Sequence, residues 1–232
     1  MADPNREMLC KVAEALRALD IAIVYVGGAT IALYLDSYAA SQVRVTIDVD
    51  CVVPISSLTE YQTLEAHLRK LGFRHCHDEN APICRWNYDD LTIDIMPFDD
   101  SVLGFANHFS RQGFAHAQEH ELAPGLVIRT LTPSYYFASK VEAYESRGAK
   151  APYESKDLED VIALLDGAPD LETEIAKATD EVRKYVARWA TLFLRNPLAR
   201  DLVEGHIARG PLFEQRIERV LLRLRRLSSA PP

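Results

Sequence analysis

Residues 46–53 read Thr-Ile-Asp-Val-Asp-Cys-Val-Val, and before them residues 21–26 read Ile-Ala-Ile-Val-Tyr-Val and end at Gly27-Gly28. Both runs are short, rich in β-branched residues and followed by Gly or Pro, which predicts two buried strands. Residues 29–35 return to a helix-forming pattern, so the predicted order is strand, glycine turn, helix. This order indicates a mixed α+β fold.

Three acidic residues interrupt otherwise apolar strands. Side chains alternate across a strand, so Asp48 and Asp50 share one face, and Asp94 occupies the corresponding face of a later strand, residues 91–95. A carboxylate on a core strand is costly unless something compensates its charge, and Mg²⁺ is bound through one or two carboxylates together with substrate phosphates. If these two strands are neighbours, we expect the three aspartates to converge on a pair of Mg²⁺ or Mn²⁺ ions. The alternative is that they decorate a solvent-facing sheet.

The glycine pair supplies the second part of such a site. A glycine turn from a strand into a helix lets phosphate oxygens approach the backbone N–H groups at the helix N-terminus. Gly27 and Gly28 are therefore candidate phosphate-binding residues, and Thr30 in the first turn adds a hydroxyl. Arg44 either orients phosphates or pairs with one of the aspartates of residues 46–53.

The rest of the chain divides at Pro133. Before it, an amphipathic helix is expected at residues 5–19 and another at residues 58–71, with a strand hairpin over residues 83–95 and a strand at residues 125–131. After it, helices are expected at the following positions: residues 135–147, 155–165, 171–194 and 214–227. We predict an α/β domain over residues 1–132 with a mixed sheet and flanking helices, followed by a C-terminal helical bundle over residues 133–232.

The composition of the chain argues against several classes of function and location. The chain has 232 residues, and its acidic residues outnumber its basic ones to give a net charge of −8. That balance argues against broad binding to phosphate backbones, which depends on clustered Lys and Arg. No apolar run reaches the roughly 18–20 residues that a membrane-spanning helix needs, and the polar start does not resemble a secretory signal. We expect a cytoplasmic protein without membrane association, whose four cysteines are reduced thiols.

Two motifs imitate zinc sites. Residues 75–78 read His-Cys-His-Asp, but adjacent side chains point apart, so surface histidines are the favoured interpretation. Residues 116–120 read His-Ala-Gln-Glu-His, which matches a zinc-peptidase string that requires a long helix. Gly113 and the pair Pro124-Gly125 leave little room for one, so a hairpin is expected instead.

The order of these motifs resembles a known group of enzymes. Residues 27–30 (Gly-Gly-Ala-Thr), residues 44–50 (Arg-Val-Thr-Ile-Asp-Val-Asp) and Asp94 look like the nucleotidyltransferase superfamily of polymerase-β-like fold, in particular its AbiEii/AbiGii toxin-like branch. That branch also has a helix with Lys and then a Lys/Arg-Asp-x-x-Asp helix, to which residues 139–148 and 155–161 correspond. The resemblance covers about residues 20–168. The long stretch between the glycine pair and Asp48 departs from the family pattern.

The resemblance implies Mg²⁺-dependent transfer of a nucleoside monophosphate from an NTP such as ATP to an acceptor hydroxyl, with release of pyrophosphate. It suggests tRNA ends as acceptor, a toxin role and a cognate antitoxin; a protein side chain or a small molecule are the other acceptors. Asp48, Asp50, Asp94, Lys140 and Asp157 are then the candidate catalytic residues.

Residues of the second half suit these roles. Lys140, Tyr144 and Arg147 share one helix face, so the two cations can hold a triphosphate or form a solvated basic stripe. Asp157 lies at the margin of an apolar helix face and is a candidate base for the acceptor hydroxyl. Asp160 lies further round, and for it an ordinary first-turn carboxylate is an equal alternative.

The last 22 residues carry five arginines and two glutamates, a local charge of +3. These arginines either form part of a strip for a polyanionic acceptor or solvate an amphipathic terminal helix. A function of another class also fits the sequence, namely a non-catalytic nucleotide- or partner-binding module of the same fold.

Overall fold

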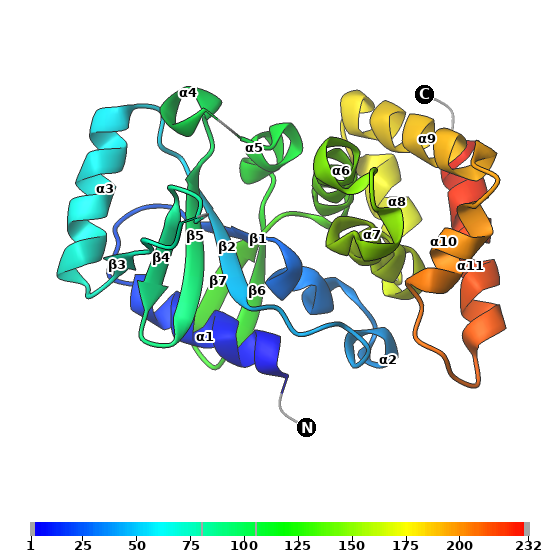
Figure 1. Ribbon diagram of the computed structural model, residues 1–232, viewed down its shortest axis with the longest axis horizontal. Helices are drawn as coiled ribbons and strands as arrows, with labels where there is room; N and C mark the ends of the chain where they lie inside the picture. Colours follow the sequence, from blue (N-terminus) through cyan, green and yellow to red (C-terminus); the bar gives the residue numbers. More distant parts are fainter. Residues whose placement is uncertain (1–2, 80, 105, 230–232) are drawn as a thin grey trace. The chain divides into compact units, whose positions relative to one another are not determined.

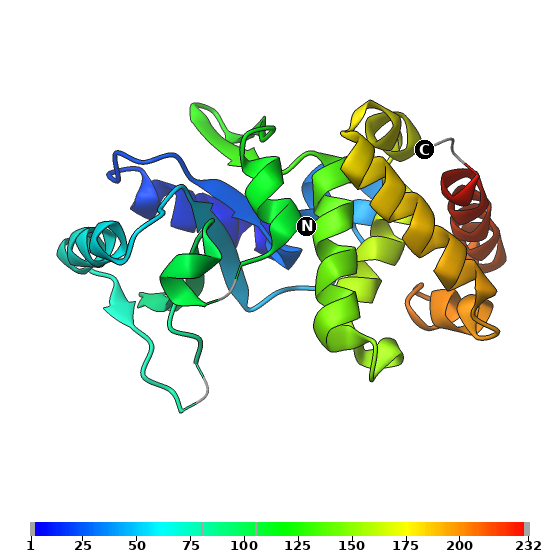
Figure 2. The same cartoon turned by 90° about the horizontal axis from the view of Figure 1, so that it is seen from above.

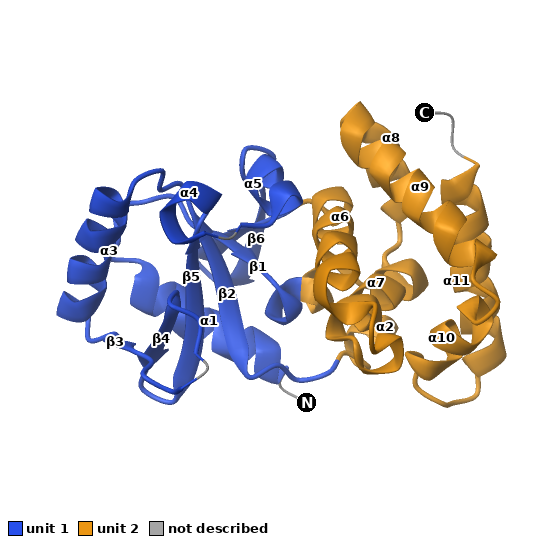
Figure 3. Ribbon diagram, turned by 45° about the horizontal axis from the view of Figure 1, so that its top comes forward, with its two compact units in different colours: residues 1–30, 44–131 blue, residues 31–43, 132–232 orange. Residues whose placement is uncertain are grey.

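The computed structural model describes residues 3–79, 81–104 and 106–229, and the chain forms two compact units (Figure 3). The first unit comprises residues 1–30 and 44–131, and the second comprises residues 31–43 and 132–232. The division after Leu131 lies one residue from the predicted domain boundary. No sequence pattern indicated that residues 31–43 belong with the C-terminal helices. The predicted outer limits of the two domains, residues 1 and 232, lie outside the described residues.

The first unit is built on a mixed seven-stranded sheet with the order β3-β4-β5-β2-β1-β7-β6 (Figure 1). Its strands have the following bounds: β1 Val24–Val26, β2 Asp48–Val53, β3 Arg74–His75, β4 Arg85–Tyr88, β5 Leu91–Pro97, β6 Gln118–Ala123 and β7 Leu126–Thr130. The described residues of the first unit also form the α-helices α1 Pro4–Leu16, α3 Leu58–Lys70, α4 Asp100–Leu103 and α5 His108–Phe114. Helix α1 packs across β2, β5, β6 and β7. The predicted mixed sheet with flanking helices is confirmed.

The helix after the glycine turn differs from the prediction in type. Residues Gly28–Tyr34 form the 3₁₀ helix η1 and not an α-helix, and α2 (Ser37–Ala40) follows at once, capped by the Asp36 side chain. Asp36 also donates its backbone N–H to the carbonyl of Gly167, and a Cβ at Gly167 would collide with that of Ala39. These contacts hold residues 31–43 within the second unit.

Strand register places the acidic residues. Strands β2 and β5 are parallel with Asp50 opposite Asp94, and β4 is antiparallel to β5 with Arg85 opposite Asp94. The other face of the same strands is apolar and buried, with Val49, Ile93 and other core residues. Alternation therefore separates a core face from a face that carries charge, as the sequence predicts.

The second unit is helical. Besides α2 it contains α6 Pro133–Ala143, the π-helical turn η2 Tyr144–Gly148, η3 Pro152–Glu154, α7 Lys156–Gly167, α8 Leu171–Lys177, α9 Asp180–Arg195, α10 Ala199–Gly205 and α11 Phe213–Ser228. Helices α9 and α11 pack side by side, as Figures 1 and 2 both show. The single helix predicted over residues 171–194 is wrong, because Thr179 breaks it and caps α9 by accepting from the Val182 N–H.

The arginines of α11 make internal contacts. Arg216 is buried and its Nε lies 2.8 Å from the Asp166 carboxylate, while Arg219 donates to the Asp166 backbone carbonyl at 2.9 Å. Arg223 donates to the carbonyls of Leu165 and Ala168. These groups lie at the C-terminal end of α7, where carbonyls lack helical partners and positive charge is favourable. Arg216 is therefore not a surface residue, and Arg219 and Arg223 cap a neighbouring helix while part of each side chain stays exposed.

Within residues 3–79, 81–104 and 106–229, none of the helices has the length and apolarity needed to cross a membrane.

Candidate active site

The first unit holds a charged group that we call the strand cluster: Asp48, Asp50, Asp94 and Arg85. The Arg85 guanidinium donates from Nε and Nη2 to the two oxygens of Asp94 at 2.8 and 2.7 Å, and from Nη2 to Asp48 at 3.2 Å. Asp94 is buried, with 7% exposure, whereas Asp48 and Asp50 are partly exposed. The hydrogen bonds that Arg85 donates to Asp94, together with the nearby negative charges, raise the pKa of Arg85 above its usual value, although burial opposes this.

Arg85 was not among the residues proposed from sequence. The predicted hairpin could have indicated it. With a turn at Asp89-Asp90, Tyr88 lies opposite Leu91, and three residues further along each strand Arg85 lies opposite Asp94. Its backbone is held on both sides, because its N–H donates to Pro82 and its carbonyl accepts from Cys76.

The predicted glycine turn meets the strand cluster. Gly27 has φ +74°, a conformation that L side chains avoid, and a Cβ there would collide with the Asp50 carboxylate. At Gly28 a Cβ would lie 2.7 Å from Nη2 of Arg44. The turn thus brings bare backbone against one anionic and one cationic side chain. Thr30 is fully buried and its hydroxyl donates to the Gly27 carbonyl at 3.0 Å, so it closes the turn.

Asn5 on α1 positions the segment that leads into β2. Its side-chain amide donates to the Arg44 carbonyl at 3.0 Å and accepts from the Thr46 N–H at 2.9 Å. The amide thereby pairs with backbone groups as a neighbouring strand would. Asn5 is buried at 3% exposure and orders the residues on either side of Val45. Sequence reasoning missed it, because one Asn in an amphipathic helix is indistinguishable from a surface residue.

The donor chemistry of the strand cluster fits a divalent cation. Carboxylate oxygens are the hard ligands that Mg²⁺ prefers, and Asp48 and Asp50 stand two residues apart on one strand face. Across the described ranges, however, no three His, Cys, Asp or Glu side chains gather as a ligand set. Both oxygens of the third carboxylate, Asp94, face Arg85. Asp48 and Asp50 are therefore suited to bind a divalent cation. The prediction that Asp94 also binds one, as part of a metal pair, stays a prediction.

The second unit holds a separate group, the helix cluster: Lys140, Arg147, Asp157 and Asp160. Lys140 is buried, and its Nζ lies 2.6 Å from Asp160 and 3.3 Å from Asp157. Asp160 also accepts from the Tyr136 hydroxyl at 3.3 Å. Asp160 is thus an integral member of a buried ion-pair network and not an ordinary first-turn carboxylate. The predicted position further round the helix is wrong, because Asp157 and Asp160, at i and i+3 of α7, share a face and both contact Lys140.

Arg147 and Asp157 form a two-point pair, with Nε–Oδ2 and Nη2–Oδ1 distances of 2.8 and 3.0 Å. Burial pushes the pKa of Asp157 upward, but hydrogen bonds from Arg147 and the charges of Lys140 and Arg147 outweigh it and hold the pKa below its usual value. The lowered pKa makes Asp157 a weaker base than an ordinary aspartate, so the predicted role of proton acceptor suits it less well than that of an ion-pair partner.

Arg147 lies in the π-helical turn η2, an irregularity that is common at functional sites. A Cβ at Gly148, the last residue of this turn, would collide with the Ser155 side chain, which caps α7. The turn therefore lets the end of α6 approach the start of α7, where Asp157 lies. Arg147 keeps 71% of its side chain exposed while paired.

The two zinc-like motifs have other structures. Residues Gln118–Ala123 form strand β6, which pairs with β7, so the predicted hairpin is confirmed and the peptidase helix is absent at these residues. His75 forms a hydrogen bond with Glu65 at 2.9 Å, and its ring packs against that of Trp86 at a tilt of 39°.

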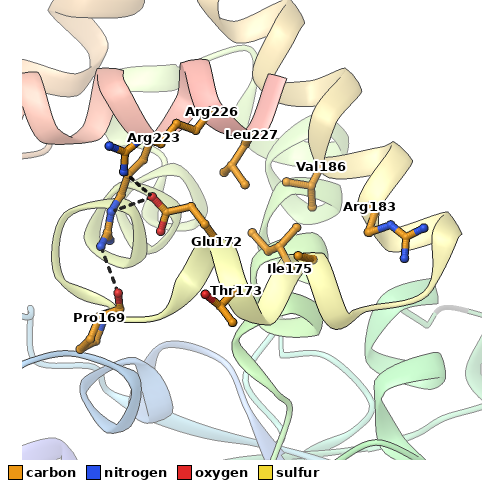
Figure 4. A pocket seen from close by; sticks show the side chains of 10 residues that line it. Pro169, Glu172, Thr173, Ile175, Arg183, Val186, Arg223, Arg226 and Leu227 are labelled. Atoms are coloured by element: carbon orange, nitrogen blue, oxygen red, sulfur yellow. Dashed lines mark hydrogen bonds and ion pairs between the residues drawn. The ribbon is translucent and has the colours of Figure 1, made fainter. Parts of the chain in front are cut away.

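Two cavities lie apart from the predicted site residues. One of about 620 Å³ is formed by α8, α9 and α11 (Figure 4). In it Glu172 lies 3.4 Å from Arg223 and 3.6 Å from Arg226, beside apolar side chains. The other, of about 710 Å³, lies in the first unit beside Ile21, Ile55 and Leu64. None of the candidate catalytic or phosphate-binding residues lines either cavity.

The mixed sheet with its flanking helices is a nucleotidyltransferase-like fold. The chain is similar to an antigenic nucleotidyltransferase-like protein from Paracoccidioides brasiliensis, known from a crystal structure, with a TM-score of 0.55 and 16% identity over 92% of this chain and 98% of that one. No protein-family model and no curated protein matches the sequence. At this identity the likeness shows the fold, and the narrower resemblance to AbiEii/AbiGii-like toxins stays a prediction.

Proposed function

We propose that the protein is a nucleotidyltransferase that moves a nucleoside monophosphate from an NTP to an acceptor hydroxyl in the presence of Mg²⁺ or Mn²⁺. The observation that carries this proposal is the strand cluster beside the Gly27-Gly28 turn, in which Asp50 and Arg44 flank bare backbone. The nucleotidyltransferase-like fold supports the same reaction class.

In this reaction the acceptor oxygen forms a bond to the α-phosphorus, the bond from that phosphorus to the bridging oxygen breaks, and pyrophosphate leaves with the electron pair. The hydroxyl proton passes to solvent. A cation bound by Asp48 and Asp50 would supply charge neutralisation for the phosphates. The turn at Gly27 and Gly28 gives phosphate oxygens close access to the backbone, and Arg44 adds a positive charge at Gly28.

The acceptor and the biological role rest on the resemblance. We propose tRNA ends as acceptor, with a toxin role and a cognate antitoxin. Internal contacts occupy Arg216, Arg219 and Arg223, so an RNA strip would depend on other cations, such as Lys150 and Lys156. Participation of Lys140 and Asp157 in the transfer reaction stays a prediction.

The test is incubation with each α-labelled NTP, Mg²⁺ and total cellular RNA or protein. We expect label on RNA from the wild type and a loss of at least 100-fold in Asp50→Asn, since removing a metal-binding carboxylate removes transition-state stabilisation. Asp90→Asn, in the exposed turn of the same sheet, is the matched control and should keep full activity. Label on protein alone would overturn the RNA acceptor. If no NTP gives labelled RNA or protein, the proposed nucleotidyltransferase activity is refuted and a non-catalytic nucleotide- or partner-binding function is favoured.

A further inference from the structure

The ion-pair geometry of Arg85 bears on how many cations the strand cluster holds. Both oxygens of Asp94 accept short hydrogen bonds from one guanidinium, in the two-point arrangement that arginine and carboxylate form most strongly. A divalent cation on the same oxygens would have to displace this guanidinium or lie against a like charge.

Arg85 is also held in place. It is the first residue of β4, in register with Asp94, and its backbone N–H and carbonyl are both hydrogen-bonded outside the ladder. Its side chain is only 25% exposed, and it spans from Asp94 to Asp48 on the neighbouring strand. A side chain anchored in this way is a fixed positive charge within a group of three carboxylates.

Building on the proposed function, we infer that Arg85 takes the charge-compensating place of a second divalent cation, so that the strand cluster binds one cation, on Asp48 and Asp50, and not two. Asp94 then acts as a positioning residue through Arg85. One arginine and one divalent ion together neutralise the three carboxylates, with phosphates of the nucleotide completing the ligands of the ion.

The test counts Mn²⁺ bound per chain by titrating the full-length protein with Mn²⁺ alone and following the free-ion signal by electron paramagnetic resonance. We expect one Mn²⁺ in the wild type and two in Arg85→Gln, which removes the positive charge from Asp94 and keeps an uncharged polar side chain at this position. Arg85→Lys keeps the positive charge and should keep one. Asp94→Asn in the Arg85→Gln background should return the count from two to one.

Two Mn²⁺ in the wild type, or one in Arg85→Gln, would overturn the inference. Thermal unfolding of each variant shows whether it is folded, and the pair Arg85→Lys and Arg85→Gln separates loss of charge from loss of structure. If the wild type binds no Mn²⁺ yet transfers label in an Asp50-dependent way, the inference fails and the proposed function stands. If one Mn²⁺ binds but no NTP gives label, the proposed function fails and the cation count still holds.

Discussion

The buried pair between Arg216 and Asp166 allows a quantitative prediction for the C-terminal helix. Both side chains are nearly inaccessible, at 7% and 3% exposure, and lie 2.8 Å apart. Removing one partner of a buried pair costs about 3–5 kcal/mol, because the other charge is left without compensation. Arg219 remains 3.4 Å from the same carboxylate. We therefore expect Arg216→Met to lower the free energy of unfolding by about 3 kcal/mol, the low end of that range.

The chain provides its own reporter and control. It has two tryptophans, Trp86 in the first unit and Trp189 in the second, so a Trp86→Phe background reports denaturant unfolding of the second unit by fluorescence. Arg225→Met changes an exposed arginine on the same helix and should alter stability by less than about 0.5 kcal/mol. Equal effects of the Arg216 and Arg225 substitutions would refute the capping role of α11 and revive a surface role for its arginines.

Three further predictions concern the two clusters. Gly27→Ala should cost about 1–2 kcal/mol from its left-handed backbone, a further amount from the collision with Asp50, and transfer activity, because Asp50 is displaced. Gly125→Ala, with φ +75° and open space around its Cβ among the described atoms, should cost only the backbone part and keep activity. Activity retained in the Gly27 variant would contradict the turn's role. Lys140→Met should lower the unfolding free energy of the second unit by about 3–5 kcal/mol, because it removes a positive charge that compensates buried carboxylates. A change below about 1 kcal/mol would show that Lys140 is not required to compensate the charge of Asp157 and Asp160. Folding lowers the pKa of Asp157 from 3.8, so its ionised side chain stabilises the fold above that pH, and this stabilisation disappears as pH falls through the pKa of the folded state. The difference in unfolding free energy between wild type and Asp157→Asn should therefore shrink below pH 3.8. A difference that stays constant during acid unfolding would refute the pairing.

Local sequence patterns predicted the strands of the sheet, the hairpin and the face on which each strand residue lies. Strands β2 and β5 and the hairpin with β4 follow from apolar alternation and the Asp89-Asp90 turn, and the shared face of Asp48 and Asp50 follows from the same periodicity. Placing Asp94 beside Asp50 required that their strands be neighbours, which the sequence allowed but did not dictate.

Contacts between distant segments escaped prediction. Asn5 contacts the segment that leads into β2, 41 residues later, and Arg216 neutralises a carboxylate 50 residues earlier. Neither residue differs in type from its surface neighbours, so only tertiary packing distinguishes them. The break at Thr179 was missed for a related reason: apolar periodicity continues across it, while a single capping side chain ends one helix and starts the next.

The attachment of residues 31–43 to the end of α7 has a consequence for how the chain folds during synthesis. This segment leaves the ribosome before residues 44–131, and its partner, Gly167, comes after them. At roughly 5–20 residues per second, the segment waits on the order of ten seconds for that partner. Folding of the second unit therefore cannot begin from a local nucleus in this segment, and a fragment starting at residue 132 would lack a piece of its own core.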